Sequence, residues 1–200
     1  MIIVHPMSTS PRPHQPNHIT LDATAVRVLA HPLRVRLLGQ LRRYGPATAT
    51  TVAKALGTNT GATSYHLRKL AQVGLVVETG GGRSRERWWR AAHEMHSWLP
   101  SKVADDPDAR AAASWLTGFH LRFFIERAER WARRRDSESA AWQDEAGASD
   151  YLLHLDPTQL HNLHQELYAV IERYRVGESG SEARPLMLFI HAFPDDGDAA

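Results

Sequence analysis

Apolar residues recur every three or four positions between residues 22 and 72, the spacing of helices that pack on a core. They predict a first helix up to Ala30, a second that starts at Pro32, a short third over residues 50–56 and a fourth over residues 60–72. Pro32 suits a first helical turn, because the N–H that proline lacks has no helical partner there. The third and fourth helices are separated only by the tight turn of residues 57–60.

Two short apolar segments follow the fourth helix and predict a β-hairpin. Residues 75–78 read LVVE and residues 87–90 read RWWR, with three glycines at 80–82 between them as a tip. Branched and aromatic side chains of this kind suit half-buried strands. A winged helix-turn-helix contains two helices, a short helix, a turn, a helix and a hairpin, and the predicted elements follow this order. We therefore expect residues 21–95 to form such a domain.

The second half of the chain has a different pattern. A long helix is expected over about residues 108–135, and its apolar residues cover more than one face, so it should be buried on two sides. A polar connector follows over residues 136–149. The segment 151–155 resembles a strand, a helix follows to about Arg175, and residues 185–194 resemble a last strand.

The expected fold class is therefore mainly α with small β. A winged helix-turn-helix is followed by a long dimerisation helix and a small α/β C-terminal part, with residues 105–200 as a dimerisation and possible effector domain. Residues 1–20 are rich in Pro and His and lack periodicity, so we expect a flexible leader rather than a secretory signal.

Charge is divided unevenly between the two halves. Residues 1–100 carry 13 Lys and Arg against 4 Asp and Glu, whereas residues 101–200 carry 11 against 18. This asymmetry favours a basic module that meets a polyanion. The chain has no cysteine, which excludes disulfides and thiolate metal sites. No apolar run is long enough to span a membrane, so a cytoplasmic location without membrane contact is expected.

The fourth helix carries the candidate chemistry. At 100° per residue Thr63, Leu67 and Leu70 share one side, which should pack on the preceding helix. A helix that enters the major groove needs small residues near its start and long donors further along. The residues that meet this need on the opposite side and its flank are Gly61, Ser64, Tyr65, Arg68 and Lys69.

The hairpin adds a second set of candidate contacts. Alternation along a strand places Arg83, Arg85 and Arg87 on one edge, where they could follow a phosphate backbone or enter a minor groove. An arginine-rich hairpin alone is equally a solvated turn. After a helix-turn-helix pattern it favours DNA.

The segments LAHPLRVRLLGQL and TVAKALGTNTGATSYHLRKLAQVGLV, followed by the glycine-rich arginine hairpin, closely resemble ArsR-type winged helix-turn-helix transcription regulators. The resemblance covers residues 22–92. It implies a homodimer whose two recognition helices read a pseudo-palindromic operator. Repression by blocking the operator is the simpler mechanism that the resemblance implies. By this resemblance Ser64, Tyr65 and Arg68 face bases and the hairpin arginines face the backbone. No cofactor or catalysis is implied.

Two alternatives stay open. The chain could be a protein–protein adaptor with a winged-helix fold that no longer binds DNA, which a binding curve flat in salt would indicate. Its twelve histidines include the pairs His93 and His96, and His161 and His164, each at i, i+3 spacing. Such pairs could make it a histidine-based metal-responsive regulator. The pattern names no small-molecule effector, although one is possible.

Overall fold

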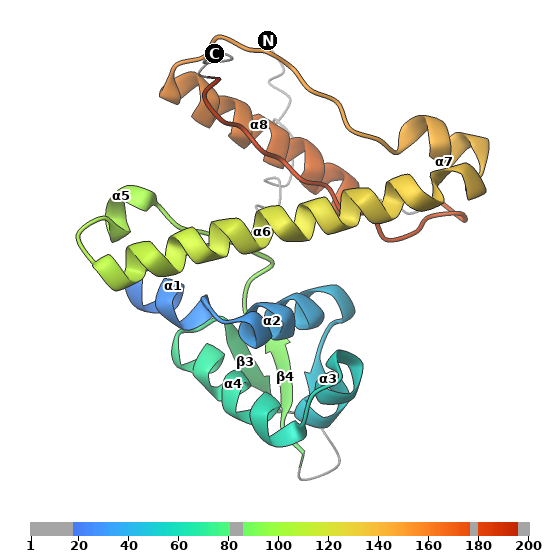
Figure 1. Ribbon diagram of the computed structural model, residues 1–200. Helices are drawn as coiled ribbons and strands as arrows, with labels where there is room; N and C mark the ends of the chain where they lie inside the picture. The colour runs from blue at the N-terminus through green and yellow to red at the C-terminus, as the bar shows by residue number, and fades with distance from the viewer. Residues whose placement is uncertain (1–17, 81–85, 177–179, 196–200) are drawn as a thin grey trace, which may run out of the picture. The chain divides into compact units, whose positions relative to one another are not determined.

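The computed structural model describes residues 18–80, 86–176 and 180–195 (Figure 1). The chain divides into two compact units between Leu121 and Arg122, inside the long helix α6 (Pro107–Arg134). We call the described residues up to Leu121 the winged-helix unit and those from Arg122 the C-terminal unit. No helix in the described residues is both long and apolar enough to cross a membrane.

The winged-helix unit contains the predicted order of helices and strands. In chain order its elements before α6 are β1 (His18–Thr20), α1 (Ala23–Leu29), α2 (Pro32–Tyr44), β2 (Ala47–Thr48), α3 (Ala49–Leu56), α4 (Thr60–Gln72), β3 (Val76–Thr79), β4 (Trp88–Ala91), β5 (Met95–Ser97) and α5 (Pro100–Val103). The four expected helices and the hairpin strands are thus confirmed, with ends within about two residues of prediction, as is usual for helix termini.

The hairpin belongs to a three-stranded antiparallel sheet in the order β2-β4-β3. In its register Val76 lies opposite Ala91, and Ala47 lies opposite Trp89. The two-residue strand β2 was not predicted from the sequence. It joins the start of α3 to the hairpin, so the hairpin and the helix-turn-helix are held by one sheet.

A second, two-stranded sheet pairs β1 with β5 in parallel, with His18 opposite Met95. The sequence predicts a mobile leader over residues 1–20, but residues 18–20 form this strand instead. Residues 1–17 lie outside the described residues. Three residues are too few to show a period of two, so this strand follows only from its pairing with β5.

One core joins α1, α2, α3 and α4 to the hairpin and to the start of α6. Its largest fully buried side chains come from several elements and include Leu29, Leu37, Leu67, Leu75 and Leu116. The first half of α6 contributes Ala109 and Ala113 as well. The helical stripes predicted for α2 and α4 therefore bury as expected.

The C-terminal unit is helical rather than α/β. After α6 it contains η1 (Arg135–Ser137), α7 (Ala140–Glu145) and α8 (Pro157–Val176). The strands predicted at residues 151–155 and 185–194 do not form. Both segments have strand-like composition, but a strand also needs a hydrogen-bonding partner, and neither segment has one among the described residues.

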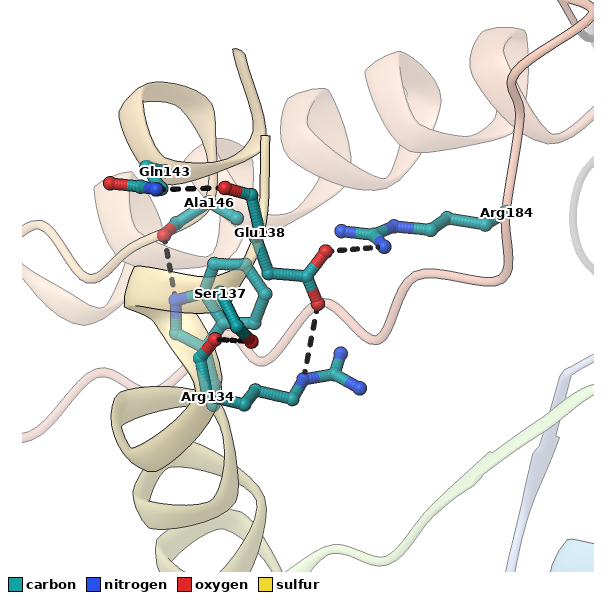
Figure 2. A network of polar contacts seen from close by, with 7 residues as sticks. Arg134, Ser137, Glu138, Gln143, Ala146 and Arg184 are labelled. Atoms are coloured by element: carbon teal, nitrogen blue, oxygen red, sulfur yellow. Dashed lines mark hydrogen bonds and ion pairs between the residues drawn. The ribbon is translucent and has the colours of Figure 1, made fainter. Parts of the chain in front are cut away.

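A set of polar contacts ties residue 184 to the end of α6 (Figure 2). The Glu138 carboxylate accepts a hydrogen bond of 2.8 Å from Nη1 of Arg184 and lies 3.5 Å from Nε of Arg134. The Arg184 guanidinium also lies 3.9 Å from the centre of the Trp142 ring. The carbonyl of Glu138 accepts from the side chain of Gln143 at 2.8 Å. These contacts fix both ends of the chain that runs from α7 through α8.

Candidate nucleic-acid interface

Helix α4 is positioned by the turn before it and by its buried side. Gly57 ends α3 with φ 64°, a left-handed conformation that favours glycine. Asn59 then caps α4, and its Oδ1 accepts a hydrogen bond of 2.7 Å from the amide of Ala62. Thr63, Leu67 and Leu70 are fully buried, as the sequence predicts. The opposite side of α4 therefore faces outward.

The outward side of α4 carries the predicted DNA-facing residues. Gly61, Tyr65 and Arg68 are exposed, and Ser64 and Lys69 are half-buried. The Nε of Arg68 donates a hydrogen bond of 3.2 Å to the carbonyl of Ser64, which lays the arginine along the helix. The Lys69 ammonium lies 5.8 Å from the centre of the Tyr65 ring, within range of a cation–π contact.

Three of the predicted residues line one hollow of about 300 Å³, together with the start of α3. Ser64 and Arg68 come from α4, and Arg87 comes from the start of the returning hairpin strand. The other lining residues are Thr48, Ala49, Thr50, Thr60, Glu86 and Trp89. The hollow is therefore lined by three threonines and two arginines, which suit phosphate oxygens, and by one carboxylate, Glu86, which does not.

The contribution of α3 was missed from the sequence. Thr48 caps this helix through a hydrogen bond of 3.2 Å from the amide of Thr51, and Ala49 and Thr50 begin it. The threonines at positions 48, 50 and 51 were the available signal, because such residues favour helix starts. Only the hollow shows that this helix start lies beside Arg68.

The hairpin arginines are only partly described. Arg83 and Arg85 lie outside the described residues. Arg87 is exposed, and its Nη1 lies 3.6 Å from a carboxylate oxygen of Glu78 on the neighbouring strand. An exposed ion pair of this length is weak, so it leaves the arginine available to another anion.

The inner flank of α4 contacts the start of α2 through two histidines. The rings of His31 and His66 lie 4.4 Å apart, and Nδ1 of His31 accepts a hydrogen bond of 3.1 Å from the amide of Leu33. Burial is the main cause that lowers the pKa of His31, and the charge of Arg34 adds to it. Burial is also the main cause that lowers the pKa of His66, with smaller effects from His31 and Arg34. Both rings are therefore neutral at pH 7. The rings of Tyr65 and His66 make an edge contact, with their centres 5.1 Å apart.

The histidine pair beyond the hairpin binds an arginine. The Arg42 guanidinium donates to the carbonyl of His93 at 3.0 Å and to Nδ1 of His96 at 2.6 Å. Its positive charge disfavours a metal ion at the same place. Across the described ranges, no three His, Asp or Glu side chains come together as metal ligands would. His161 is exposed, and His164 stacks on Tyr168 at 6.1 Å.

Comparison with known proteins identifies the centre of this unit. Residues 29–79 match the family model described as a helix-turn-helix domain. Over 62 residues the chain is 44% identical to the HTH-type transcriptional regulator NmtR of Mycobacterium tuberculosis, which is 31% of this chain and 51% of that protein. The predicted resemblance to ArsR-type winged helix-turn-helix regulators is confirmed.

The chain thus spans about half the length of this curated relative. Among solved structures, it is similar to the AntR antimony-specific transcriptional repressor at 26% identity and a TM-score of 0.34, over 53% of this chain and 78% of that one. It is also similar to RV1404 from Mycobacterium tuberculosis at 16% identity and a TM-score of 0.31, over 78% of this chain and 84% of that one.

Proposed function

We propose that the protein is a sequence-specific DNA-binding transcriptional regulator. In this proposal it acts in the cytoplasm as a homodimer and represses by occupying a pseudo-palindromic operator. The observation that carries the proposal is the hollow that joins Ser64 and Arg68 of the helix-turn-helix domain to Arg87 of the hairpin. One duplex can contact all three, since a groove and its flanking phosphates are close together.

The residues divide into two roles. Arg68 is long enough to reach the O6 and N7 of a guanine, and Ser64 and Tyr65 can contact base edges or a neighbouring phosphate. Gly61 lets the start of α4 approach the duplex, because glycine has no side chain to hold the two apart. Lys69, Arg87, Arg83 and Arg85 are assigned to phosphates, which position the protein without reading sequence.

Binding of the start of α3 to a phosphate is part of the same proposal. Thr48 and Thr50 line the same hollow as Arg68. Hydroxyl groups of this kind donate to phosphate oxygens, and the start of α3 carries the positive end of a helix dipole. The DNA strand next to the recognition helix α4 would then be held by both α3 and α4.

Two alternatives compete with this proposal: a protein–protein adaptor that no longer binds DNA and a histidine-based metal-responsive regulator. The test is capture of genomic fragments by the purified full chain, followed by footprinting of the best fragment. A protected inverted repeat supports the proposal. Binding that stays at the non-specific level at every salt concentration contradicts it, and it favours the adaptor.

Two controls make the footprint specific. Arg68→Ala should remove the protection, whereas Arg173→Ala, an equal loss of charge on the exposed side of α8, should keep it. If both variants lose protection equally, the effect is one of net charge, and Arg68 does not read a base. Repeating the capture with a small-molecule extract tests for an effector that gates binding.

A further inference from the structure

The helices of the winged-helix unit carry positive charge without acidic residues between them. Residues 23–77 contain eight Lys and Arg and no Asp or Glu. Two arginines of α2 use protein carbonyls as partners. Arg36 donates a hydrogen bond of 3.1 Å to the carbonyl of Leu56, and Arg42 donates to the carbonyl of His93 at 3.0 Å. A cation of this region that has no such partner needs an anion from outside the region.

Arg34, in the first turn of α2, is a cation of this kind. Its guanidinium makes no hydrogen bond or ion pair within the described residues, and its Nε is buried without an acceptor there. Burial lowers the pKa of Arg34, and the nearby Tyr65 phenol offsets this effect in part. The side chain is half-buried and keeps its charge at pH 7. A half-buried charge without a counter-ion is costly, which indicates a ligand that supplies one.

Tyr65 and Lys69 extend this site from α4, which packs on α2 (Figure 1). They are four positions apart, so they share one flank of the helix. The Lys69 ammonium lies 5.8 Å from the centre of the Tyr65 ring. No described carboxylate forms an ion pair with Lys69. A phenol, a guanidinium and an ammonium group therefore lie together without an acidic side chain to neutralise them.

The neutral histidine pair holds Tyr65 and Arg34 at this place. The ring of His66 lies between those of Tyr65 and His31, with centres 5.1 Å and 4.4 Å away. Burial chiefly lowers the pKa of both histidines, and the charge of Arg34 adds to this effect because its guanidinium lies near both rings. Groups that are held in place before a ligand arrives bind it at a lower entropic cost.

This site is separate from the hollow that Arg68 lines. Neither Arg34 nor Tyr65 lines that hollow. Tyr65 is turned by about 100° from Ser64 around the axis of α4, because a helix has 3.6 residues per turn. A helix that lies in the major groove has one DNA strand along each flank. Contacts on two flanks of α4 can therefore reach two different strands.

We propose that Arg34, Tyr65 and Lys69 bind a phosphate of the DNA strand that lies across the major groove from the strand held by α3. The proposal rests on the proposed function and deepens it. It adds Arg34 to the interface and assigns Tyr65 to the backbone rather than to a base. The phenol, guanidinium and ammonium groups all donate hydrogen bonds to phosphate oxygens, and those of the two cations are charge-assisted. The duplex then supplies the anion that Arg34 lacks within the described residues.

Neutral methylphosphonate linkages, placed one at a time in the operator duplex, test this site with the full chain. Neutralising the phosphate bound here should weaken wild-type binding about tenfold and Arg34→Gln binding about twofold. Tyr65→Phe removes only the hydroxyl of an exposed side chain, and it should lose part of the sensitivity at the same phosphate. Arg43→Gln, an equal loss of charge at the exposed end of α2, should keep the full sensitivity.

A purely structural role of Arg34 gives a different result. Arg34→Gln would then weaken binding to the native duplex and to every neutralised duplex by the same factor. If no linkage affects the wild type more than it affects Arg34→Gln and Tyr65→Phe, the proposal is overturned.

A free anion is the other source of a phosphate group. Inorganic phosphate is therefore added to the chain without DNA, at constant ionic strength, and thermal unfolding is measured. If phosphate stabilises the wild type but not Arg34→Gln, while no linkage is coupled to Arg34, the site binds a free anion and the DNA assignment is wrong.

Salt dependence separates this site from the proposed function. Phosphate contacts do not read sequence, so Arg34→Gln should lower the slope of log K against log salt by about 1 on the operator and on an unrelated duplex. An operator footprint without a coupled linkage contradicts the site and leaves the proposed function standing. Non-specific binding without a footprint, but with the lower slope in Arg34→Gln, contradicts the proposed function and leaves the site standing. A chain that binds no duplex contradicts both.

Discussion

Nη1 of Arg42 donates a hydrogen bond of 2.6 Å to Nδ1 of His96 and thereby joins the end of α2 to β5. A guanidinium has no acceptor, so Nδ1 of His96 must carry a lone pair and the ring must be neutral. Burial, followed by the charge of Arg42, lowers the pKa of His96 to about 3. Burial also lowers the pKa of Arg42 to about 10, so Arg42 keeps its charge at pH 7.

The stability of the winged-helix unit should therefore depend on pH through His96. Below pH 6.5 the unfolded chain binds a proton at His96 that the folded chain does not, so stability falls as pH falls through the window from 6.5 to about 3. The loss between pH 6.5 and pH 5 should be about 2 kcal/mol. Urea unfolding at several pH values measures it. His96→Gln keeps an acceptor for Arg42 and should remove the His96 part of this slope, leaving the part that comes from His31 and His66, whereas the exposed His161→Gln should leave the curve unchanged.

Thr63 offers a stabilising substitution. Its side chain is fully buried on α4, and its hydroxyl has no hydrogen-bond partner among the described residues. Thr63→Val replaces the hydroxyl with a methyl group of similar size, so it should stabilise the chain by about 1 kcal/mol. Thermal unfolding measures the change. A loss of stability would show that the hydroxyl has a partner, such as a buried water.

The cap of the recognition helix should contribute to the free energy of unfolding, independently of DNA binding. Asn59→Ala removes the oxygen that accepts from Ala62, and it should cost about 1 kcal/mol in urea unfolding. Asn59→Asp keeps an acceptor and should restore most of that stability. If the alanine variant is as stable as the wild type, the cap does not hold the start of α4.

Sequence accounted for the helices of the winged-helix unit better than for its strands. Leu67 and Leu70 repeat at helical spacing and are buried where that spacing places them, because a helix makes its own hydrogen bonds. A strand depends on a partner elsewhere in the chain. His18 pairs with Met95, far along the sequence, and no local pattern reveals it. The apolar segment 151–155 has the composition of a strand and lacks that partner.

The candidate site was predictable to a similar degree. Helical geometry placed Ser64 and Arg68 on the outward side of α4, because Thr63 fixes the opposite side. The approach of Thr48 and Arg87 to that side is set by strand β2 and its pairing with β4, which the sequence did not predict.

Arg68→Ala should weaken binding to the operator by about 1–3 kcal/mol, roughly five- to 150-fold, and relax specificity at one base pair. The loss follows from the bidentate contact proposed for its guanidinium. Fluorescence anisotropy with the operator and with single-base variants of it measures both effects. Equal weakening on every sequence would assign Arg68 to a phosphate instead.

Arg87→Gln should act differently from Arg68→Ala. A lost phosphate contact weakens binding evenly across sequences and lowers the slope of log K against log salt by about 1. Glu78→Gln removes the carboxylate 3.6 Å from Arg87 and should strengthen binding modestly, since the arginine loses a competitor. An unchanged salt slope in Arg87→Gln would place that side chain away from the backbone.

The contact between Glu138 and Arg184 closes a ring of chain. The two residues are 46 positions apart, and their ion pair brings together the ends of a span that includes α7 and α8. Ends held together lower the entropic cost of every contact made within the span. A protease that cuts once between α7 and α8 would leave two fragments joined by this ion pair and by the contacts of Arg184 with Trp142 and of Phe189 with Phe124, so high salt should loosen them only in part.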